Sequence, residues 1–324
     1  MTRPRPDWLP PARDGVSPSR VAVHGGAWDS VAEFLAARLP GAGDWPARLA
    51  RGDVLDSQGG ALAADAPCVP GTVLWYWRSL PPEPRIPFDI EVLHQDAQLV
   101  VVDKPHFLPV TPGGRYLQET VLVRLKRLLG LGTLVPMHRL DLETAGVMLF
   151  MVQPDTRPAY QALLRERRMH KVYEAVAPWR SGLGLPRIVS SRLQERPQAF
   201  MQMQAVAGEP NAHTLIELIE RLRPVAPSAD TRPGAAPGNE LAHYRLTPLT
   251  GRKHQLRAQL SELGLPICGD RIYPRLWPEP ALGAAPDYTQ PLQLLARELS
   301  FTDPLSGEPR RYVSRRRLEL ARQP

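Results

Sequence analysis

A short charged run followed by an apolar segment is the best candidate for chemistry in this chain. Asp141 follows His138 and Arg139, and Gly146 ends the turn. Nearby cationic donors keep a carboxylate ionised and aimed, which is the state that a nucleophile or general base requires. The apolar segment 147–152 has the length and composition of a buried strand. We therefore expect Asp141 at the end of a core strand, where a charged group needs a functional reason.

A second candidate is the basic segment 251–260, which takes on helical periodicity from Leu256 onward. A helix that opens among cations gathers positive charge and N-terminal amides at one place. This arrangement suits a phosphate or a buried carboxylate. A solvated basic face is the alternative interpretation of the same pattern. The cations concerned are Arg252, Lys253, His254 and Arg257.

A third segment, 171–176, alternates as a strand and carries Lys171 and Tyr173. The alternation leaves open which set of side chains faces the core. Tyr173 and Ala175 form one set, and Val172, Glu174 and Val176 form the other. For a lone tyrosine on a strand, packing in the core is the alternative to a role in a site.

Composition and charge narrow the classes of protein to which this chain can belong. The chain has 324 residues and a formal net charge of +7, which favours a polyanionic partner. Cys68 and Cys268 are too few for a disulfide framework or a zinc site. No apolar run approaches the roughly 18 to 20 residues of a membrane span. The N-terminus lacks the apolar region of a secretory signal, so we expect a cytoplasmic protein without membrane attachment.

The chain divides by composition into segments of different character. We expect a disordered Pro- and Arg-rich arm over 1–20, a small α/β domain over 21–80 and a large domain over 85–324. Within the large domain, the low-complexity segment 224–239 predicts a flexible insertion. Periodicity further predicts helices over 30–39 and 119–131, and strands within 90–104 and over 213–221 and 243–249.

Taken in chain order, these segments resemble the RluA-type family of RNA pseudouridine synthases over residues 88–315. The family pattern H-R-L-D-x-x-T-S-G is matched at His138, Arg139, Leu140, Asp141, Thr144 and Gly146. The pattern G-R-x-H-Q-[IL]-R-x-H is matched at Gly251, Arg252, His254, Gln255, Leu256 and Arg257. Shorter patterns V-x-D-K-P, K-x-Y-x-A and P-I-x-G-D are matched at 101–105, 171–175 and 266–270. The chain departs from the family at Ala145, Gln259, Pro274 and Leu295.

The resemblance implies an α+β fold with a central mixed, mainly antiparallel sheet flanked by helices. It implies a divergent S-four-like RNA-binding domain at 21–80. The implied activity is the isomerisation of specific uridines to pseudouridine in structured RNA, with ribosomal RNA slightly favoured over transfer RNA. This reaction needs no metal and no cofactor, and we expect a monomer.

The resemblance also assigns roles to individual residues. Asp141 would be the catalytic carboxylate, and Arg257 would pair with it to keep it ionised and oriented. Tyr173 would stack on the uracil and assist proton removal from C5. Arg139 would fill the space of the flipped-out base. The remaining residues expected to bind RNA are His138, Lys104, Lys171, Arg252, Lys253 and His254.

Parts of the sequence are also compatible with other classes of function. An RNA-binding protein or RNA-folding chaperone with an impaired site is the main alternative. A glycosidase-like hydrolase needs two carboxylates, and Asp141 with Glu143 is the nearest pair. We expect Glu143 to be a surface residue beside the turn, because its position in the motif is variable. The spacing around Asp141 does not fit a kinase catalytic loop.

Overall fold

The computed structural model describes residues 9–25, 28–41, 43–78, 83–197, 199–222, 240–278 and 286–322. The chain forms two compact units. Residues up to Arg85 together with Thr111–Gly132 make the first, and Ile86–Val110 together with the residues from Thr133 onward make the second. By composition, we expected 111–132 to belong to the large domain. The structure instead groups this segment with the N-terminal unit.

The first unit is built on a three-stranded antiparallel sheet of order β1-β3-β2. The predicted cap of its first helix is present, because Ser30 Oγ accepts a hydrogen bond from the Glu33 amide at 3.2 Å. The Glu33 carboxylate accepts from the Asp29 amide at 2.9 Å. The elements are β1 (Ser19–Ala22), α1 (Val31–Arg38), α2 (Trp45–Ala50), β2 (Val54–Leu55), β3 (Val73–Tyr76) and α3 (Val121–Leu129).

The segment 9–20 differs from the predicted disordered arm. Val16 is only 6% exposed and packs with Leu117 and with Val123 of α3. Apolar burial therefore holds this segment, which the count of Pro and Arg did not indicate. Residues 1–8 lie outside the described part of the chain. The S-four-like identity of the N-terminal unit stays a prediction.

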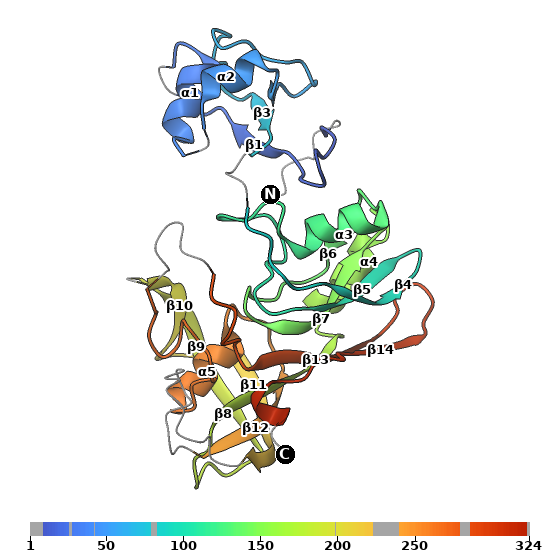
Figure 1. Ribbon diagram of the computed structural model, residues 1–324, viewed down its shortest axis with the longest axis vertical. Helices are drawn as coiled ribbons and strands as arrows, with labels where there is room; N and C mark the ends of the chain where they lie inside the picture. Colours follow the sequence, from blue (N-terminus) through green and yellow to red (C-terminus); the bar gives the residue numbers. More distant parts are fainter. Residues whose placement is uncertain are drawn as a thin grey trace. The chain divides into compact units, whose positions relative to one another are not determined.

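The second unit contains one large, mainly antiparallel sheet, which confirms the predicted fold class (Figure 1). Its order is β10-β9-β11-β12-β8-β13-β7-β5-β4, with β14 beside β13 and β6 beside β7. The strands are β4 (Glu91–Gln95), β5 (Leu99–Lys104), β6 (Val135–Pro136), β7 (Ala145–Met151), β8 (His170–Pro178), β9 (Arg187–Arg196), β10 (Ala199–Val206), β11 (Ala212–Leu222), β12 (Leu241–Pro248), β13 (Leu294–Thr302) and β14 (Pro309–Val313). The helical elements are α4 (Arg157–Arg165), α5 (Gln255–Glu262) and a 3-10 turn (Leu320–Arg322).

Strands β7 and β13 run parallel and approach each other closely. Gly146 has φ +114°, and a Cβ there would lie 2.2 Å from the Ala296 carbonyl oxygen. Glycine is therefore required at this position. Next to it, Ala145 pairs with Leu295 in the register. Both residues depart from the family pattern and both lie in one buried apolar cluster, so the two departures meet as a matched contact.

Two helices cover different parts of this sheet. Tyr160 and Leu163 of α4 pack on Leu149 and its neighbours on β5 and β7. Leu256 and Leu260 of α5 pack on β8 and β12. Figure 1 shows α5 (orange) beside β9 and β10. The sheet thus has a helix over each of two regions. The loop that follows β6 leads into β7, and the loop that follows β12 leads into α5.

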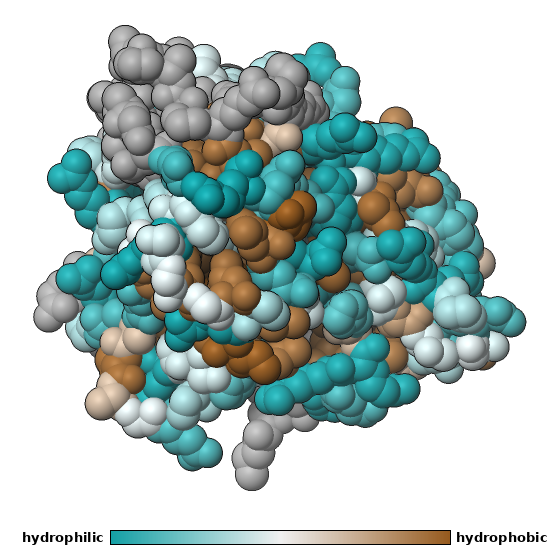
Figure 2. Space-filling view, turned by 90° about the horizontal axis from the view of Figure 1, so that it is seen from below, coloured by the Kyte–Doolittle hydropathy of each residue, from teal (hydrophilic) through white to brown (hydrophobic). Residues whose placement is uncertain are grey.

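The predicted insertion 224–239 lies outside the described residues. Its flanks are paired, since Leu222 of β11 lies opposite Leu241 of β12. Among the described residues, no helix is long and apolar enough to cross a bilayer. On the face drawn in Figure 2, hydrophobic side chains are interspersed with hydrophilic ones.

A partly buried polar network links Glu174 of β8, through Arg297 of β13, to the segment that follows β14. Arg297 donates to both oxygens of Glu174 at 2.8 Å and to the carbonyls of Ser314 and Arg316 at 2.8 Å. His243 Nε2 lies 3.2 Å from Glu174 Oε2. Burial alone would raise the pKa of Glu174, but these partners outweigh it and lower the pKa from 4.5 to about 2.

We expect Glu174→Gln to lower the free energy of unfolding at pH 7 by up to about 3 kcal/mol, the equivalent of this pKa shift. Because the folded pKa is depressed, the stabilisation is complete above pH 4.5 and is lost as the pH falls toward about 2. Urea denaturation at pH 7 and pH 3 measures this. Glu298→Gln is the control, since its partner Arg311 is 67% exposed and the expected loss is below about 1 kcal/mol. An equal loss in both variants would contradict the assignment.

Candidate active site

Asp141 lies in the loop that connects β6 to β7. The loop turns tightly, since the Thr144 amide donates to the Asp141 carbonyl at 3.2 Å. Two side chains hold the following backbone: Lys104 Nζ donates to the Leu142 carbonyl at 2.9 Å, and His106 Nδ1 lies 2.6 Å from the Glu143 carbonyl. Burial lowers the pKa of His106 to about 4, so the neutral ring donates to this oxygen. The Asp141 backbone is therefore held in place at the start of β7.

Lys104 does not contact solvent, so the expectation that it binds phosphate is wrong for this structure. It is 0% exposed, and its Nζ donates to the carbonyls of Pro105, Leu108 and Leu142 at 2.8–2.9 Å. Burial lowers the pKa of Lys104 to about 7, whereas three carbonyl acceptors favour the ammonium form, which has three N–H donors. Lys104 therefore holds the Asp141 loop in place through the Leu142 carbonyl.

We expect Lys104→Met to lower turnover and to destabilise the fold by about 1–3 kcal/mol, because three buried carbonyls lose their donor. The salt dependence of RNA binding should not change, since no phosphate contact is lost. Lys171→Met is the matched control. Lys171 lines the cavity described below, and its replacement should reduce that salt dependence. A reduced salt dependence in Lys104→Met would restore the original expectation.

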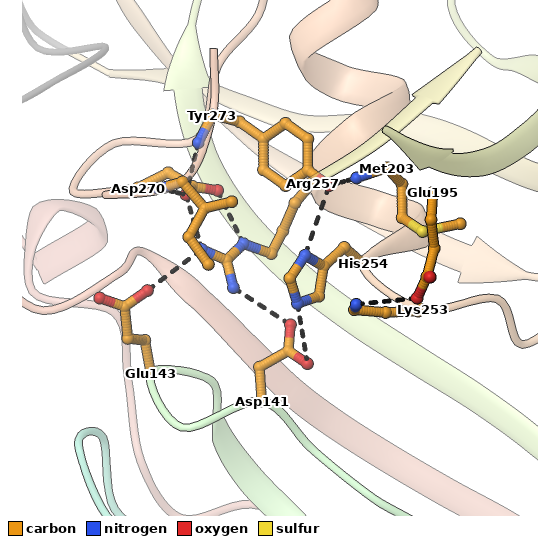
Figure 3. A network of polar contacts seen from close by, with 10 residues as sticks. Asp141, Glu143, Glu195, Met203, Lys253, His254, Arg257, Asp270 and Tyr273 are labelled. Atoms are coloured by element: carbon orange, nitrogen blue, oxygen red, sulfur yellow. Dashed lines mark hydrogen bonds and ion pairs between the residues drawn. The ribbon is translucent and has the colours of Figure 1, made fainter. Parts of the chain in front are cut away.

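Arg257 is the centre of the polar network around Asp141 (Figure 3). Its Nη1 donates to Asp141 Oδ2 at 3.1 Å, and its Nη2 donates to Glu143 Oε2 at 3.1 Å. Its Nε and Nη2 bind the two oxygens of Asp270 at 2.8 and 2.6 Å. The Arg257 side chain is only 2% exposed. One guanidinium therefore orients three carboxylates, and the pair that the resemblance implied between Arg257 and Asp141 is present.

The pKa values of Asp141 and Glu143 shift in opposite directions. Burial alone would raise the pKa of Asp141, but His254 and Arg257 outweigh it, and the pKa is lowered. Burial lowers the pKa of His254, so the permanent positive charge is that of Arg257. For Glu143, burial prevails and the pKa is raised, with Asp270 and Asp141 adding to the rise. Of these two carboxylates, Asp141 is therefore the one whose ionised form the environment favours.

Glu143 is not the surface residue that we expected. Its side chain is 13% exposed, and its carboxylate is turned toward Arg257 (Figure 3). It does not belong to the residues that line the cavity beside Asp141. The motif position indicated a variable residue, whereas the fold places it against a cation that is 114 residues away in the sequence. Glu143 stabilises the guanidinium that orients Asp141.

Asp270 ends the matched motif P-I-x-G-D, and its role was not expected from the sequence. It is 0% exposed, and its Oδ1 also accepts from the amides of Ile272 and Tyr273 at 2.8 and 3.0 Å. The preceding Gly269 has φ +77°, and a Cβ there would lie 2.5 Å from the Pro291 carbonyl oxygen. The Gly-Asp pair in the P-I-x-G-D match was the available signal, because glycine lets the backbone approach and the acid anchors Arg257.

His254 lies between Asp141 and Tyr273. Its Nε2 is 3.7 Å from Asp141 Oδ1, and its Nδ1 is 3.3 Å from the Tyr273 hydroxyl. The residue adopts φ +51°, which turns the chain into α5. The side chain is only 7% exposed. The structure thus places His254 against the catalytic candidate rather than on an open surface.

A cavity of about 860 Å³ opens over Asp141. Asp141 is the one acidic side chain among the described residues that line it, whereas its other charged lining residues are cations. Tyr173 is on the wall and packs against the cluster under α5, while Glu174 faces the opposite side with Arg297. Burial, with the charge of Asp141, raises the pKa of Tyr173, which keeps the phenol neutral.

The other residues expected to bind RNA take different positions around this cavity. Arg139 and Arg252 are exposed, and Lys171 and Lys253 are partly buried. Lys253 pairs with Glu195 at 3.1 Å. His138 lines the wall, and its Nε2 accepts from the Leu149 amide at 3.3 Å. Burial lowers the pKa of His138 to about 3, so this ring adds no positive charge near neutral pH.

Comparisons with known proteins point to one family. The sequence model of the RNA pseudouridylate synthase family matches residues 98–262. An uncharacterised RNA pseudouridine synthase of Synechocystis is 31% identical over 236 residues, covering 71% of this chain and 73% of that protein. The dual-specificity RNA pseudouridine synthase RluA of Haemophilus influenzae is 31% identical over 226 residues, covering 68% and 90%. The structure of human RNA pseudouridylate synthase domain containing 1 matches with a TM-score of 0.54 at 20% identity, over 72% of this chain and 86% of that one. This last likeness concerns the fold.

Proposed function

The chain belongs to the RluA-type family of RNA pseudouridine synthases, isomerases that convert uridine to pseudouridine in RNA, and we propose that Asp141 carries out the cleavage of the glycosidic bond. The observation that supports this most is the position of Asp141. It is the one acidic residue among the described residues that line the cavity, and Arg257 holds its Oδ2 at 3.1 Å. A lowered pKa keeps the carboxylate ionised at neutral pH.

The reaction places definite demands on these groups. The bond from N1 of uracil to C1′ of ribose breaks, the base turns, and C5 forms the new bond to C1′. The hydrogen on C5 leaves and N1 ends with a hydrogen, so no electrons are gained or lost overall. An ionised carboxylate beside the sugar can supply the oxygen that cleavage requires. Arg257 keeps that oxygen aimed without neutralising it.

Tyr173 is proposed to stack on the uracil during this rotation. Its ring lies on the cavity wall, and its raised pKa keeps it a neutral phenol, which suits contact with a neutral base. A neutral phenol is a weak base. If Tyr173 takes part in removing the C5 proton, its own proton must therefore move to another group in the same step.

The target uridine must leave its stack to enter the cavity, at a cost of a few kcal/mol. Arg139 is exposed at the cavity, where it can occupy the space that the base vacates. Lys171 lines the cavity and has no carboxylate partner in the described part of the chain. Lys171, Arg252 and Lys253 are proposed to bind phosphates, with ribosomal RNA slightly favoured as the substrate over transfer RNA.

Two other functions fit the site less well. A hydrolase with two carboxylates would require Glu143 to face the substrate, whereas Glu143 is turned toward Arg257 and away from the cavity lining. An RNA-folding chaperone would not need an ionised carboxylate held by a buried guanidinium. The cost of assembling three carboxylates around Arg257 favours a catalytic use.

The test is to map pseudouridine in RNA from cells that lack this protein, using carbodiimide primer extension. We expect one or more modifications to disappear, and to return with the wild-type protein but not with Asp141→Ala. Rescue by Asp141→Ala would refute the catalytic role of this residue. If no modification disappeared, the chaperone would become the better explanation.

A further inference from the structure

The turn between α4 and β8 brings arginines to the cavity that the start of α5 also lines, although α4 and α5 cover different parts of the sheet. Residues 166–169 close the helix, with the Arg168 amide donating to the Leu163 carbonyl at 2.8 Å. Leu163 and Met169 are buried in the core cluster under α4. Arg167 and Arg168 are exposed between these anchors, and both line the cavity. The turn is therefore anchored by two buried side chains, and it presents two exposed cationic side chains at the cavity.

Arg167 has a backbone conformation that does not favour arginine. Its φ is +56°, in the left-handed region where glycine and asparagine are common and where the Cβ atom of other residues costs about 1 kcal/mol. Nothing in the packing compensates for this cost, because the side chain is exposed. A helix end tolerates cations through its dipole, yet that effect falls off after the last turn of the helix. The backbone alone would favour glycine or asparagine here.

The charges of this turn are unbalanced. Glu166 is paired with Arg168 at 2.9 Å and with Arg165 at 3.5 Å. Arg167 has no carboxylate partner among the residues that the structure describes. Together with Arg139 and Arg252, which are also exposed at the cavity, these arginines make a basic rim with Asp141 as the acid inside. We define the basic rim as Arg139, Arg167, Arg168 and Arg252.

The geometry points to the α4–β8 turn as a binding surface for RNA phosphates on one side of the flipped uridine, opposite Arg252. This inference rests on the proposed function. A nucleotide that enters the cavity brings a phosphate on its 5′ side and another on its 3′ side. The group of cations at the start of α5 would bind only one of these two phosphates. Arg167 and Arg168, in the α4–β8 turn, bind the second phosphate. The RNA strand is then held on both the 5′ and the 3′ side of the base that must rotate.

The test compares Arg167→Ala with Arg165→Ala. Arg165 is on the same helix end with a 71% exposed side chain but does not line the cavity. The probe is a synthetic RNA hairpin with uridines in its loop, titrated by fluorescence anisotropy at several KCl concentrations. Arg167→Ala should weaken binding about five- to tenfold near 50 mM salt and reduce the slope of log Kd against log salt by about 0.7–0.9. Arg165→Ala should leave the affinity and the slope as in the wild type.

A second variant separates binding from folding. Arg167→Gly should be at least as stable as the wild type, because glycine accepts φ +56° without strain, yet it should bind the hairpin as weakly as Arg167→Ala. A purely structural arginine would show the reverse, with lower stability and unchanged binding. A wild-type slope in Arg167→Ala would overturn the inference. Binding is measured without turnover, so an absence of pseudouridine formation by the wild type would contradict the proposed function alone.

Discussion

Asp141→Asn is expected to abolish pseudouridine formation while the protein still folds and binds RNA. The amide has the shape of the carboxylate but lacks its charge and its nucleophilic oxygen. Removing a nucleophile from an otherwise intact site lowers turnover by several orders of magnitude, here at least about 10⁴-fold. Arg257 keeps its bonds to Glu143 and Asp270, so the loss in unfolding free energy should stay below about 1 kcal/mol.

Release of tritium from C5-labelled uridine in RNA measures the turnover, and thermal denaturation measures the fold. Glu143→Gln is the matched control, because it removes the other carboxylate of the same loop without changing the cavity lining. Its effect on turnover should be far smaller. Equal losses for Glu143→Gln and Asp141→Asn would mean that two carboxylates do the chemistry, which would favour a hydrolase-like mechanism.

Arg257→Met is expected to destabilise the protein as well as to inactivate it. The substitution leaves Asp141, Glu143 and Asp270 facing one another, with side chains 21%, 13% and 0% exposed. Buried charges without their partner cost about 3–5 kcal/mol. The stability of Arg257→Lys should lie between those of the wild type and Arg257→Met, since one ammonium cannot bind all three carboxylates as the planar guanidinium does. Arg252→Ala, at an exposed position before the same helix, should change stability by less than about 0.5 kcal/mol.

The unfolding free energies of the wild type and Arg257→Met should change with pH in opposite directions. In the wild type, Arg257 lowers the pKa of Asp141, so this contribution to stability is present at neutral pH and is lost in acid. Without Arg257, burial and mutual repulsion should raise the folded pKa of the carboxylates above their unfolded values. Arg257→Met should then become more stable as the pH falls from about 7 toward about 4, as measured by urea denaturation. A loss of stability in acid parallel to the wild type would contradict this account.

Much of the local structure could be predicted from residue types and spacing. The apolar segment that follows Asp141 is the fully buried strand β7, and the Ser30 cap begins a helix as expected. Hydrophobic periodicity and capping act over a few residues, so they are visible along the chain. Prediction failed where burial depended on distant segments. Val16 is ordered by apolar contacts with residues about a hundred positions later, which the Pro- and Arg-rich composition could not indicate.

The sequence by itself determined the family, the order of its motifs and the choice of Asp141, because these depend only on residue types at fixed spacings. The tertiary structure decided what surrounds that carboxylate. The fold directs the Glu143 carboxylate toward Arg257 and pairs Asp270 with the same guanidinium. It also buries Lys104 against the Leu142 carbonyl, where the ammonium cannot bind RNA. The reason is physical: the charge state and direction of a buried side chain depend on its neighbours in space, and Arg257 is 116 residues away from Asp141 along the chain.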